Sequence, residues 1–210
     1  GLCTGGLMEF SQPTIPQLGL RSSSSRILFD GADDFVNLGD PAESQMGTDD
    51  FSVAYWASVT GTAEAMVISK HDGPSAYDGW RFGAEGGNYR WRLSDGTTGI
   101  EVDGSSTIND GALHHFVFTV DRSGNLLSYV DGSLETTTDI SSISGTIDPD
   151  EDLILGATYS GGSGFWPGII SEVALYKGTI LDAPAITVMH AGGPGFDLLT
   201  DSGDYDYASA

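Results

Sequence analysis

Residues 80–93 of the chain read WRFGAEGGNYRWRL. Apolar side chains occupy alternate positions in both halves of this stretch, namely Trp80, Phe82 and Ala84, and then Tyr89, Trp91 and Leu93. Successive side chains of a β-strand point to opposite faces, so the alternation predicts two strands with one packed face and one face at least partly wet. Arg81, Arg90 and Arg92 fall on the positions that project away from the packed face.

The same pattern continues along the chain. One predicted face carries Phe51, Val53, Tyr55, Ala57 and Val59, and another carries Ile169, Val173 and Leu175, with Ser171 among them. Short β-like runs recur at intervals of about ten residues, which is typical of a sandwich or a barrel. The predicted strands are Arg26–Phe29, Phe35–Leu38, Phe51–Val59, Ala65–Ser69, Trp80–Ala84, Tyr89–Leu93, Gly99–Val102, His115–Val120, Leu126–Val130, Leu153–Ala157 and Gly168–Tyr176. Seven Asp-Gly pairs punctuate the chain, and both residue types favour turns.

The two ends of the chain differ from its centre. Residues 1–25 predict an extended arm, because Pro13 and Pro16 interrupt regular structure and residues 22–25 are all serine. One short helix is predicted after Asp182, which can cap it, and before the Gly-Gly pair at 192–193. The organisation expected is therefore an arm (1–25), a β-domain (26–192) and an acidic tail (193–210).

The charge of the chain excludes several classes of partner. The 210 residues include 30 acids and 8 bases, giving a net charge of −22. This charge argues against binding nucleic acid and against docking on anionic lipid. No apolar run approaches about 18 residues, so no membrane insertion is expected. Cys3 is the sole cysteine, which leaves no internal disulfide. If Met8 is the natural start, no secretion signal is expected.

Seven strings in order resemble a laminin-G-like domain of the concanavalin A-like lectin/glucanase jelly-roll superfamily. They lie at residues 29–39, 51–56, 68–70, 109–116, 129–132, 153–156 and 168–176. Leu113 and His114 stand where the family pattern has Trp before His. The resemblance covers about residues 26–192 and implies an all-β, two-sheet antiparallel jelly-roll sandwich with an extended N-terminal arm and one short C-terminal helix. That fold hosts lectins, adhesins, pentraxins, glycosidases and virion proteins, so it constrains function weakly.

No enzyme activity is expected. Glycosidases of this fold resemble one another in a strand motif of Glu, any residue, Asp, two residues and Glu, whose carboxylates act as acid and nucleophile. The nearest approach is Glu101-Val102-Asp103, but Ser106 stands at the final Glu position. His114 and His115 are adjacent on a predicted strand and point to opposite faces, so they cannot share a metal ion.

The sequence requires no cofactor, and calcium is the one ion considered. Hard cations need several oxygens from closely spaced carboxylates. Asp148, Asp150 and Asp152 share one loop, and Asp72 and Asp78 bracket another. The loop at 157–161, where pentraxin-like relatives carry acids, has none. The alternative is that all five acids are solvated loop charges.

Two sets of residues are candidates for binding a glycan or a partner. Tyr77, Trp80, Tyr159, Phe165 and Trp166 lie in or beside predicted loops, where aromatic rings can stack on sugars; packing over the sandwich edge is the alternative. Arg81, Arg90 and Arg92 gather on one predicted face and suit the carboxylates of a partner subunit or an acidic glycan. Their alternative is to pair with acids of this chain.

These observations leave two main functions open. The first is a non-catalytic component of a larger surface assembly, most simply a virion structural or decoration protein, which contacts neighbouring subunits through its arm and tail. The second is an extracellular glycan-binding or adhesive module, with or without calcium. The expected location is accordingly the virion surface or the extracellular space.

Overall fold

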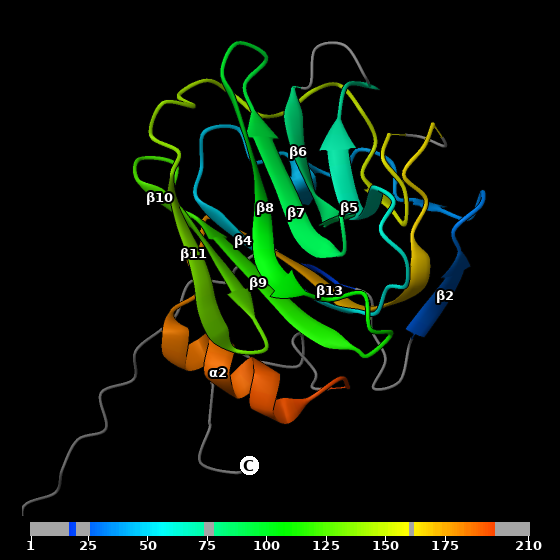
Figure 1. Cartoon of the computed structure of the whole chain (residues 1–210). Coiled ribbons are helices and arrows are strands. Elements are labelled where there is room, and N and C mark those ends of the chain that lie inside the picture. The colour runs from blue at the N-terminus through cyan, green and yellow to red at the C-terminus, as the bar shows by residue number, and fades with distance from the viewer. Residues whose placement is uncertain (1–16, 20–25, 74–77, 160–161, 196–210) are drawn as a thin grey trace, which may run out of the picture.

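The computed structural model is a sandwich of two antiparallel β-sheets, as Figure 1 shows. It describes residues 17–19, 26–73, 78–159 and 162–195. Sheet A contains β1 (Gln17–Gly19), β2 (Arg26–Asp30), β4 (Phe51–Ala57), β9 (His114–Val120), β10 (Asn125–Val130), β11 (Ser133–Asp139) and β13 (Pro167–Lys177). Sheet B contains β3 (Val36–Asn37), β12 (Ile154–Leu155), β5 (Ala65–His71), β6 (Gly79–Glu85), β7 (Asn88–Ser94) and β8 (Gly99–Thr107). The predicted jelly-roll sandwich is confirmed.

The core lies between the sheets and is built from the predicted alternating residues. Phe51, Tyr55 and Phe118 line the inner face of sheet A, and Trp80 and Phe82 line that of sheet B. The rings of Phe82 and Phe118 meet across the interface with centroids 4.6 Å apart. Burying a side chain of this size contributes about 2–3 kcal/mol, so these rings hold the two sheets together.

A bulge in β13 changes which of its residues face the core. The pairing of β13 with β4 shifts register between Ser171 and Ala174, and Glu172 in this interval has a φ of 51°. One extra residue reverses the faces of a strand. Ile170 is therefore in the core, and the prediction that Ile169 faces inward with Val173 is wrong.

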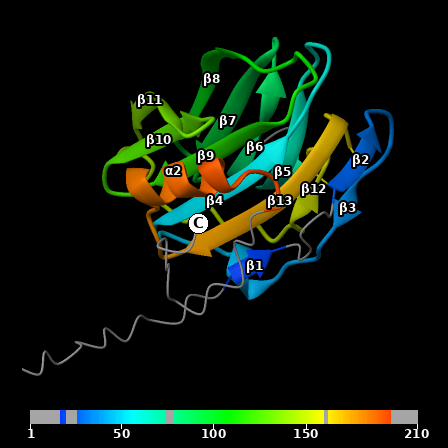
Figure 2. The same cartoon turned by 90° about the horizontal axis from the view of Figure 1, so that it is seen from below.

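The outer face of sheet A is covered by a helix, α2 (Ala183–Gly192), as Figure 2 shows. Asp182 caps the helix as predicted, because its Oδ1 accepts a hydrogen bond from the backbone N–H of Ala185 at 2.9 Å. A second apolar cluster joins helix to sheet; it comprises Ala54, Val117, Tyr129, Ala174, Tyr176, Leu181, Ile186 and Met189, with Leu127 against it. The part of this face beneath α2 is therefore dry, whereas Leu28 on β2 is exposed, so the prediction of a face that is at least partly wet holds away from the helix. Within the described residues, no helix is long and apolar enough to cross a membrane.

Two elements were not expected from the sequence. Strand β1 lies in the predicted arm, where it pairs with Ala174–Tyr176 of β13, so the prediction of an arm without regular structure is wrong at residues 17–19. Strand β11 pairs with β10 across a turn at Asp131 and Gly132. The rest of the arm and residues 196–210 of the tail lie outside the described residues, together with the subunit contacts predicted for them. A short 3-10 helix, η1 (Ala42–Ser44), precedes β4.

Candidate functional site

The outer face of sheet B is rich in charged and polar side chains, and we call it the polar face. Strand register places Ser69 of β5, Arg81 of β6, Arg92 of β7 and Glu101 of β8 in one row across four strands. A parallel row contains Arg90 beside Asp103. Residues directly opposite each other on adjacent strands share a face. The prediction that Arg81, Arg90 and Arg92 share one sheet surface is thus confirmed.

Carboxylates of the same chain surround these arginines. Arg81 contacts Glu64 at 2.7 Å and Glu101 at 2.9 Å. Arg90 forms a bidentate ion pair with Asp103, in which Nε donates to Oδ1 at 2.6 Å and Nη2 donates to Oδ2 at 2.9 Å. This hydrogen bond lowers the pKa of the Asp103 carboxyl and raises that of the Arg90 guanidinium.

Further contacts extend the network, among them one of Arg90 Nη1 with Glu101 at 3.5 Å. Arg90 also meets Glu85, and Arg92 approaches Glu101 at 3.6 Å. Four described carboxylates, from Glu64, Glu85, Glu101 and Asp103, therefore accompany three guanidinium groups. The alternative of pairing within the chain is what the geometry shows, whereas binding of an outside carboxylate stays a prediction.

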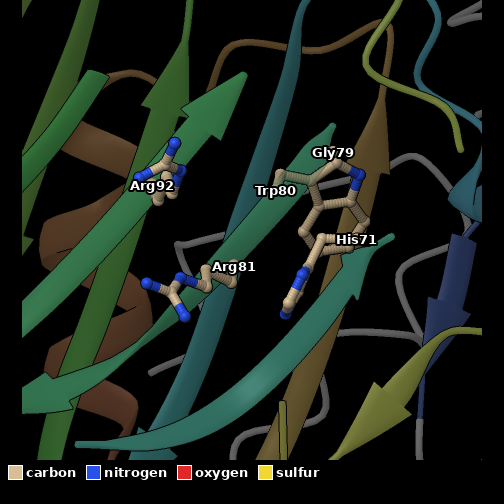
Figure 3. A pocket seen from close by; sticks show the side chains of 5 residues that line it. All are labelled: His71, Gly79, Trp80, Arg81 and Arg92. Carbon is tan, nitrogen blue, oxygen red and sulfur yellow. The ribbon is translucent and has the colours of Figure 1, made fainter. Parts of the chain in front are cut away.

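A hollow opens at one end of the polar face. It is too small to hold a water molecule, and it is lined by His71, Gly79, Trp80, Arg81 and Arg92 (Figure 3). Side chains project around it from three neighbouring strands, β5, β6 and β7. On the same face, Gly99 supplies no side chain, and a Cβ there would lie only 3.2 Å from Arg92 Nη2. Glycine at this position leaves space for the guanidinium group at the edge of the hollow.

His71 is the residue of the hollow that sequence reasoning missed. His71 is 4% exposed, and its imidazole has a hydrogen bond with the backbone of Gly73. Burial, followed by the positive charge of Arg81, lowers the pKa of His71 to about 4. The imidazole is consequently neutral at pH 7, so one nitrogen can donate a hydrogen bond and the other can accept one. The sequence could have indicated this, because His71 lies two residues after Ser69 and therefore on the same face of the strand.

Two of the predicted sugar-stacking rings are inaccessible. Trp80 is fully buried, with its ring 6.0 Å from that of Phe51 in the core. Trp166 is also buried, and its Nε1 donates to the backbone oxygen of Ser58 at 3.0 Å. The prediction is wrong for both because alternation turns Trp80 inward and because Trp166 anchors the loop before β13.

The other three aromatic candidates have different outcomes. Tyr159 is half-buried and meets the His71 ring edge-on, with centroids 5.7 Å apart, so it lies beside the hollow. Phe165 is half-buried in the loop before β13. Tyr77 lies outside the described residues. Sugar stacking by Tyr159 and Phe165 stays a prediction.

The predicted calcium loop does not gather its carboxylates. Asp148 accepts hydrogen bonds from the backbone N–H groups of residues 46–47, at 2.6 and 2.5 Å. Asp152 accepts one from Asn37 Nδ2 at 2.8 Å, and Asp150 is exposed. Asp148 and Asp152 thus join loops through hydrogen bonds, and the three carboxylates do not converge within 4.8 Å; calcium binding by this loop stays a prediction.

In the second predicted acidic pair, Asp72 and Asp78, a carboxylate also forms a hydrogen bond with the backbone. Asp72 Oδ1 accepts a hydrogen bond from the N–H of Asp78 at 2.9 Å. Burial and the neighbouring Asp72 charge raise the pKa of the Asp78 carboxyl. Among the described residues, the carboxylates that do converge within 4.8 Å are those of Asp30, Asp33 and Asp34, all exposed on a turn. Calcium binding by the chain stays a prediction.

The adjacent histidines of β9 point to opposite faces, as predicted. His114 Nδ1 lies 2.7 Å from Asp131 Oδ2 and its Nε2 lies 3.2 Å from Asp110 Oδ1. Burial alone would lower the pKa of His114, but these two acids raise it.

His115, on the other face of β9, lies beneath α2. Its ring is 5.0 Å from that of Trp56 and 5.9 Å from that of His190 on the helix. Burial and the His190 charge lower the pKa of His115 to about 4. The fold thus favours the protonated form of His114 and the neutral form of His115.

Comparison with known proteins places this geometry in a wider group. Residues 30–186 match the family described as the concanavalin A-like lectin/glucanases superfamily. No curated protein matches the chain.

Similar solved structures are binding domains of Paraclostridial Mosquitocidal Protein 1 and of botulinum neurotoxins. The binding domain of Paraclostridial Mosquitocidal Protein 1 is 15% identical with a TM-score of 0.64, covering 84% of this chain and 51% of that one. The binding domain of botulinum neurotoxin serotype G is 16% identical with a TM-score of 0.61, covering 85% and 47%. The serotype D ligand-binding domain in complex with N-acetylneuraminic acid is 14% identical with a TM-score of 0.64, covering 86% and 47%. The chain spans about half the length of these proteins, and such identities show the fold alone.

Proposed function

The chain belongs to the concanavalin A-like lectin/glucanases superfamily, and on this premise we propose that it is a non-catalytic glycan-binding module whose ligand lies on the polar face. The observation that carries the proposal is the network of Arg81, Arg90 and Arg92 with their carboxylates. It fixes guanidinium donors and carboxylate acceptors side by side on a sheet. Pre-oriented donors and acceptors of this kind select and align a polar ligand.

The state of the carboxylates supports binding over hydrolysis. A glycosidase needs one carboxylic acid that is still protonated at working pH and a second, ionised carboxylate opposite it. Here Glu101 is held by Arg81, and Asp103 has a lowered pKa because Arg90 donates to it. A carboxyl whose pKa is lowered by an arginine, as that of Asp103 is, is a poor proton donor. This matches a superfamily fold that is typical of lectins and other binding domains.

The solved structures support the same class of function. All three are binding domains, and one of them was solved in complex with N-acetylneuraminic acid. Because the sequence identities are low, the sugar is not transferred to this chain. An extracellular location is the one that suits a glycan-binding module of this fold.

A panel of immobilised glycans tests the proposal. The full chain should bind at least one member, and Arg81→Ala should weaken binding by about tenfold, since it removes charge-assisted hydrogen bonds. Arg26→Ala is a matched control, because Arg26 is an exposed arginine on sheet A. Unchanged unfolding in urea would show that Arg81→Ala is folded. Failure of the folded chain to bind any glycan, or an equal loss in the control, would contradict the proposal.

A role in a surface assembly, such as a virion structural or decoration protein, is the second candidate. It is favoured by β1, because a short segment of the N-terminal arm already adds to the edge of β13. Strand addition of this kind can equally join neighbouring subunits. Light scattering after size-exclusion chromatography should then show oligomers that are lost when residues 1–25 are deleted. A monomer at all concentrations, with or without the arm, would count against this candidate.

A further inference from the structure

We propose that β2 (Arg26–Asp30) pairs with β2 of a second copy of this chain, so that two sandwiches join edge to edge as a symmetric dimer. The inference goes beyond the proposed function and does not depend on it, because the polar face lies on sheet B and β2 belongs to sheet A. Figure 1 and Figure 2 both place β2 at the rim of the sandwich. Within the described residues, β2 pairs with β13 on one side and with no strand on the other.

The backbone groups of Leu28 are directed at this open side. Leu28 lies opposite Ile169 of β13, and both the N–H and the C=O of Ile169 form hydrogen bonds with Ser58, on the other side of β13. Residues paired in this way exchange no hydrogen bonds with each other in an antiparallel ladder, so the N–H and C=O of Leu28 point away from β13. An edge with outward backbone groups is a template for the addition of another strand.

The side chains along this edge have few contacts within the chain. Leu28 is 73% exposed, the largest value among the exposed large apolar side chains of the described residues. Arg26 is exposed, and of the described lysines and arginines it is the one with neither an ion pair nor a side-chain hydrogen bond. At the other end of β2, the exposed carboxylates of Asp30, Asp33 and Asp34 lie within 4.8 Å of one another. One end of the strand therefore has a cation to offer and the other end has an excess of anions.

The sequence of β2, RILFD, is self-complementary in the antiparallel direction. A two-fold axis at Leu28 sets this residue against the partner's Leu28 and sets Arg26 against the partner's Asp30. Residues directly opposite each other share a face, so an arginine meets a carboxylate at each end and two leucines meet at the centre. An axis at Ile27 or at Phe29 would instead set a charged residue against a leucine. The charges therefore select the register centred on Leu28, in which the same surface of both copies forms the contact.

The interface is small, so we expect a weak dimer. Each sheet gains one strand of five residues, and the two copies carry like net charges of −22. Interfaces of this size are transient, and we expect a dissociation constant of about 100 µM. At the far lower concentrations used with immobilised glycans the chain is monomeric, so Arg26→Ala keeps its role as a control for glycan binding.

Sedimentation velocity of the full chain between about 5 and 500 µM measures the association. Leu28→Asp should weaken the dimer by at least about tenfold, because it sets two carboxylates against each other at the two-fold axis. Leu134→Asp is the matched control and should leave the dimer unchanged, since Leu134 is 53% exposed on β11 at the opposite edge of the same sheet. A monomer throughout the range would overturn the inference. A dimer that survives Leu28→Asp but is lost when residues 1–25 are deleted would also overturn it, because the arm would then form the contact.

Two further sets of variants test the register. Arg26→Asp should weaken the dimer by about tenfold, and adding Asp30→Arg to it should restore association, because opposite charges again face each other. With Cys3→Ser as the background, Leu28→Cys should form a disulfide-linked dimer on mild oxidation, since hydrogen-bonded partners have Cα atoms about 5.5 Å apart. Leu134→Cys is the control and should remain monomeric.

Urea unfolding shows whether each variant is folded. No recovery of association in the folded charge exchange would overturn the register. Equal cross-linking of Leu28→Cys and Leu134→Cys would overturn the pairing of β2, and this outcome decides the matter if the charge exchange does not fold.

Discussion

Acidification from pH 7 to pH 5 should destabilise the fold by about 2 kcal/mol through His115 alone. The side chain is 1% exposed, and its pKa is lowered from 6.5 to about 4 by burial and by the charge of His190. The folded state therefore prefers the neutral ring, and the unfolded chain binds the extra proton. The pKa of this histidine is lower in the folded state than in the unfolded chain. The fold is therefore destabilised as the pH falls below the pKa of the unfolded chain.

The magnitude follows from the difference between the two pKa values. Stability starts to fall near pH 6.5, the loss is complete near pH 4, and each unit between them is worth about 1.4 kcal/mol. At pH 5 the pH lies about 1.5 units below the unfolded pKa of 6.5, so protonation of His115 stabilises the unfolded chain relative to the folded one by about 2 kcal/mol. The full interval gives about 3 kcal/mol. Protonation would also place a charge between Trp56 and the helix residue His190, so we expect α2 to loosen first.

Urea unfolding of the unaltered chain and of His115→Gln at pH 7 and pH 5 measures this effect. The variant lacks the titrating ring, so its stability should fall between these pH values by about 2 kcal/mol less than that of the unaltered chain. His71 titrates over the same interval in both proteins and cancels in the comparison.

His114 provides a control of opposite sign. Its pKa is raised in the fold by Asp131 and Asp110, so its contribution is complete at low pH and is lost as pH rises through the folded value. His114→Gln should therefore increase the loss between pH 7 and pH 5. Equal losses in the unaltered chain and His115→Gln would refute the reasoning.

Three further predictions concern stability and are checked by urea unfolding at pH 7. Asp182→Ala should cost about 1 kcal/mol, because it removes the cap of α2; no change would mean that the cap is dispensable. Asp40→Ala should cost about 2–4 kcal/mol, since it leaves the fully buried Lys70 ammonium without the carboxylate 2.7 Å away. Lys70→Met should cost less than Asp40→Ala, and the reverse order would contradict this account. Gly104→Ala should cost about 3 kcal/mol, because its Cβ would lie 2.1 Å from Cε1 of the buried Tyr89 ring.

The strands of the sandwich could be predicted because alternation is a local property. Trp80 and Arg81 alternate in the sequence, and they occupy opposite faces of β6 in the structure. Strand β11 was missed because its residues are polar and mostly exposed, although Asp131-Gly132 and the threonines at 136–138 favour a hairpin with β10.

The candidate site depended on contacts that no local pattern contains. His71 and Arg92 are 21 positions apart in the sequence, and the register of three strands brings them to one hollow. The bulge at Glu172 likewise follows from the pairing of β13 with β4, and the alternation of β13 alone predicted the wrong inward residue, Ile169. Register is set by tertiary packing, which explains why the strands and the shared face of the three arginines were predictable, whereas the position of His71 beside Arg92 was not.

The outer faces of the two sheets differ in their side chains and in what covers them. The outer face of sheet A carries apolar residues such as Val117 and Ala174, and α2 covers them. The outer face of sheet B carries three arginines with their carboxylates, and within the described residues no helix packs on it. The arginine side chains are only 9–24% exposed, and the loss of hydration on burying an ion pair offsets much of its attraction, so stability alone does not explain why β6, β7 and β8 present so many charges in one place. The fixed positions of these charges, on a face that no described helix covers, are what support our proposal that this face binds a polar ligand.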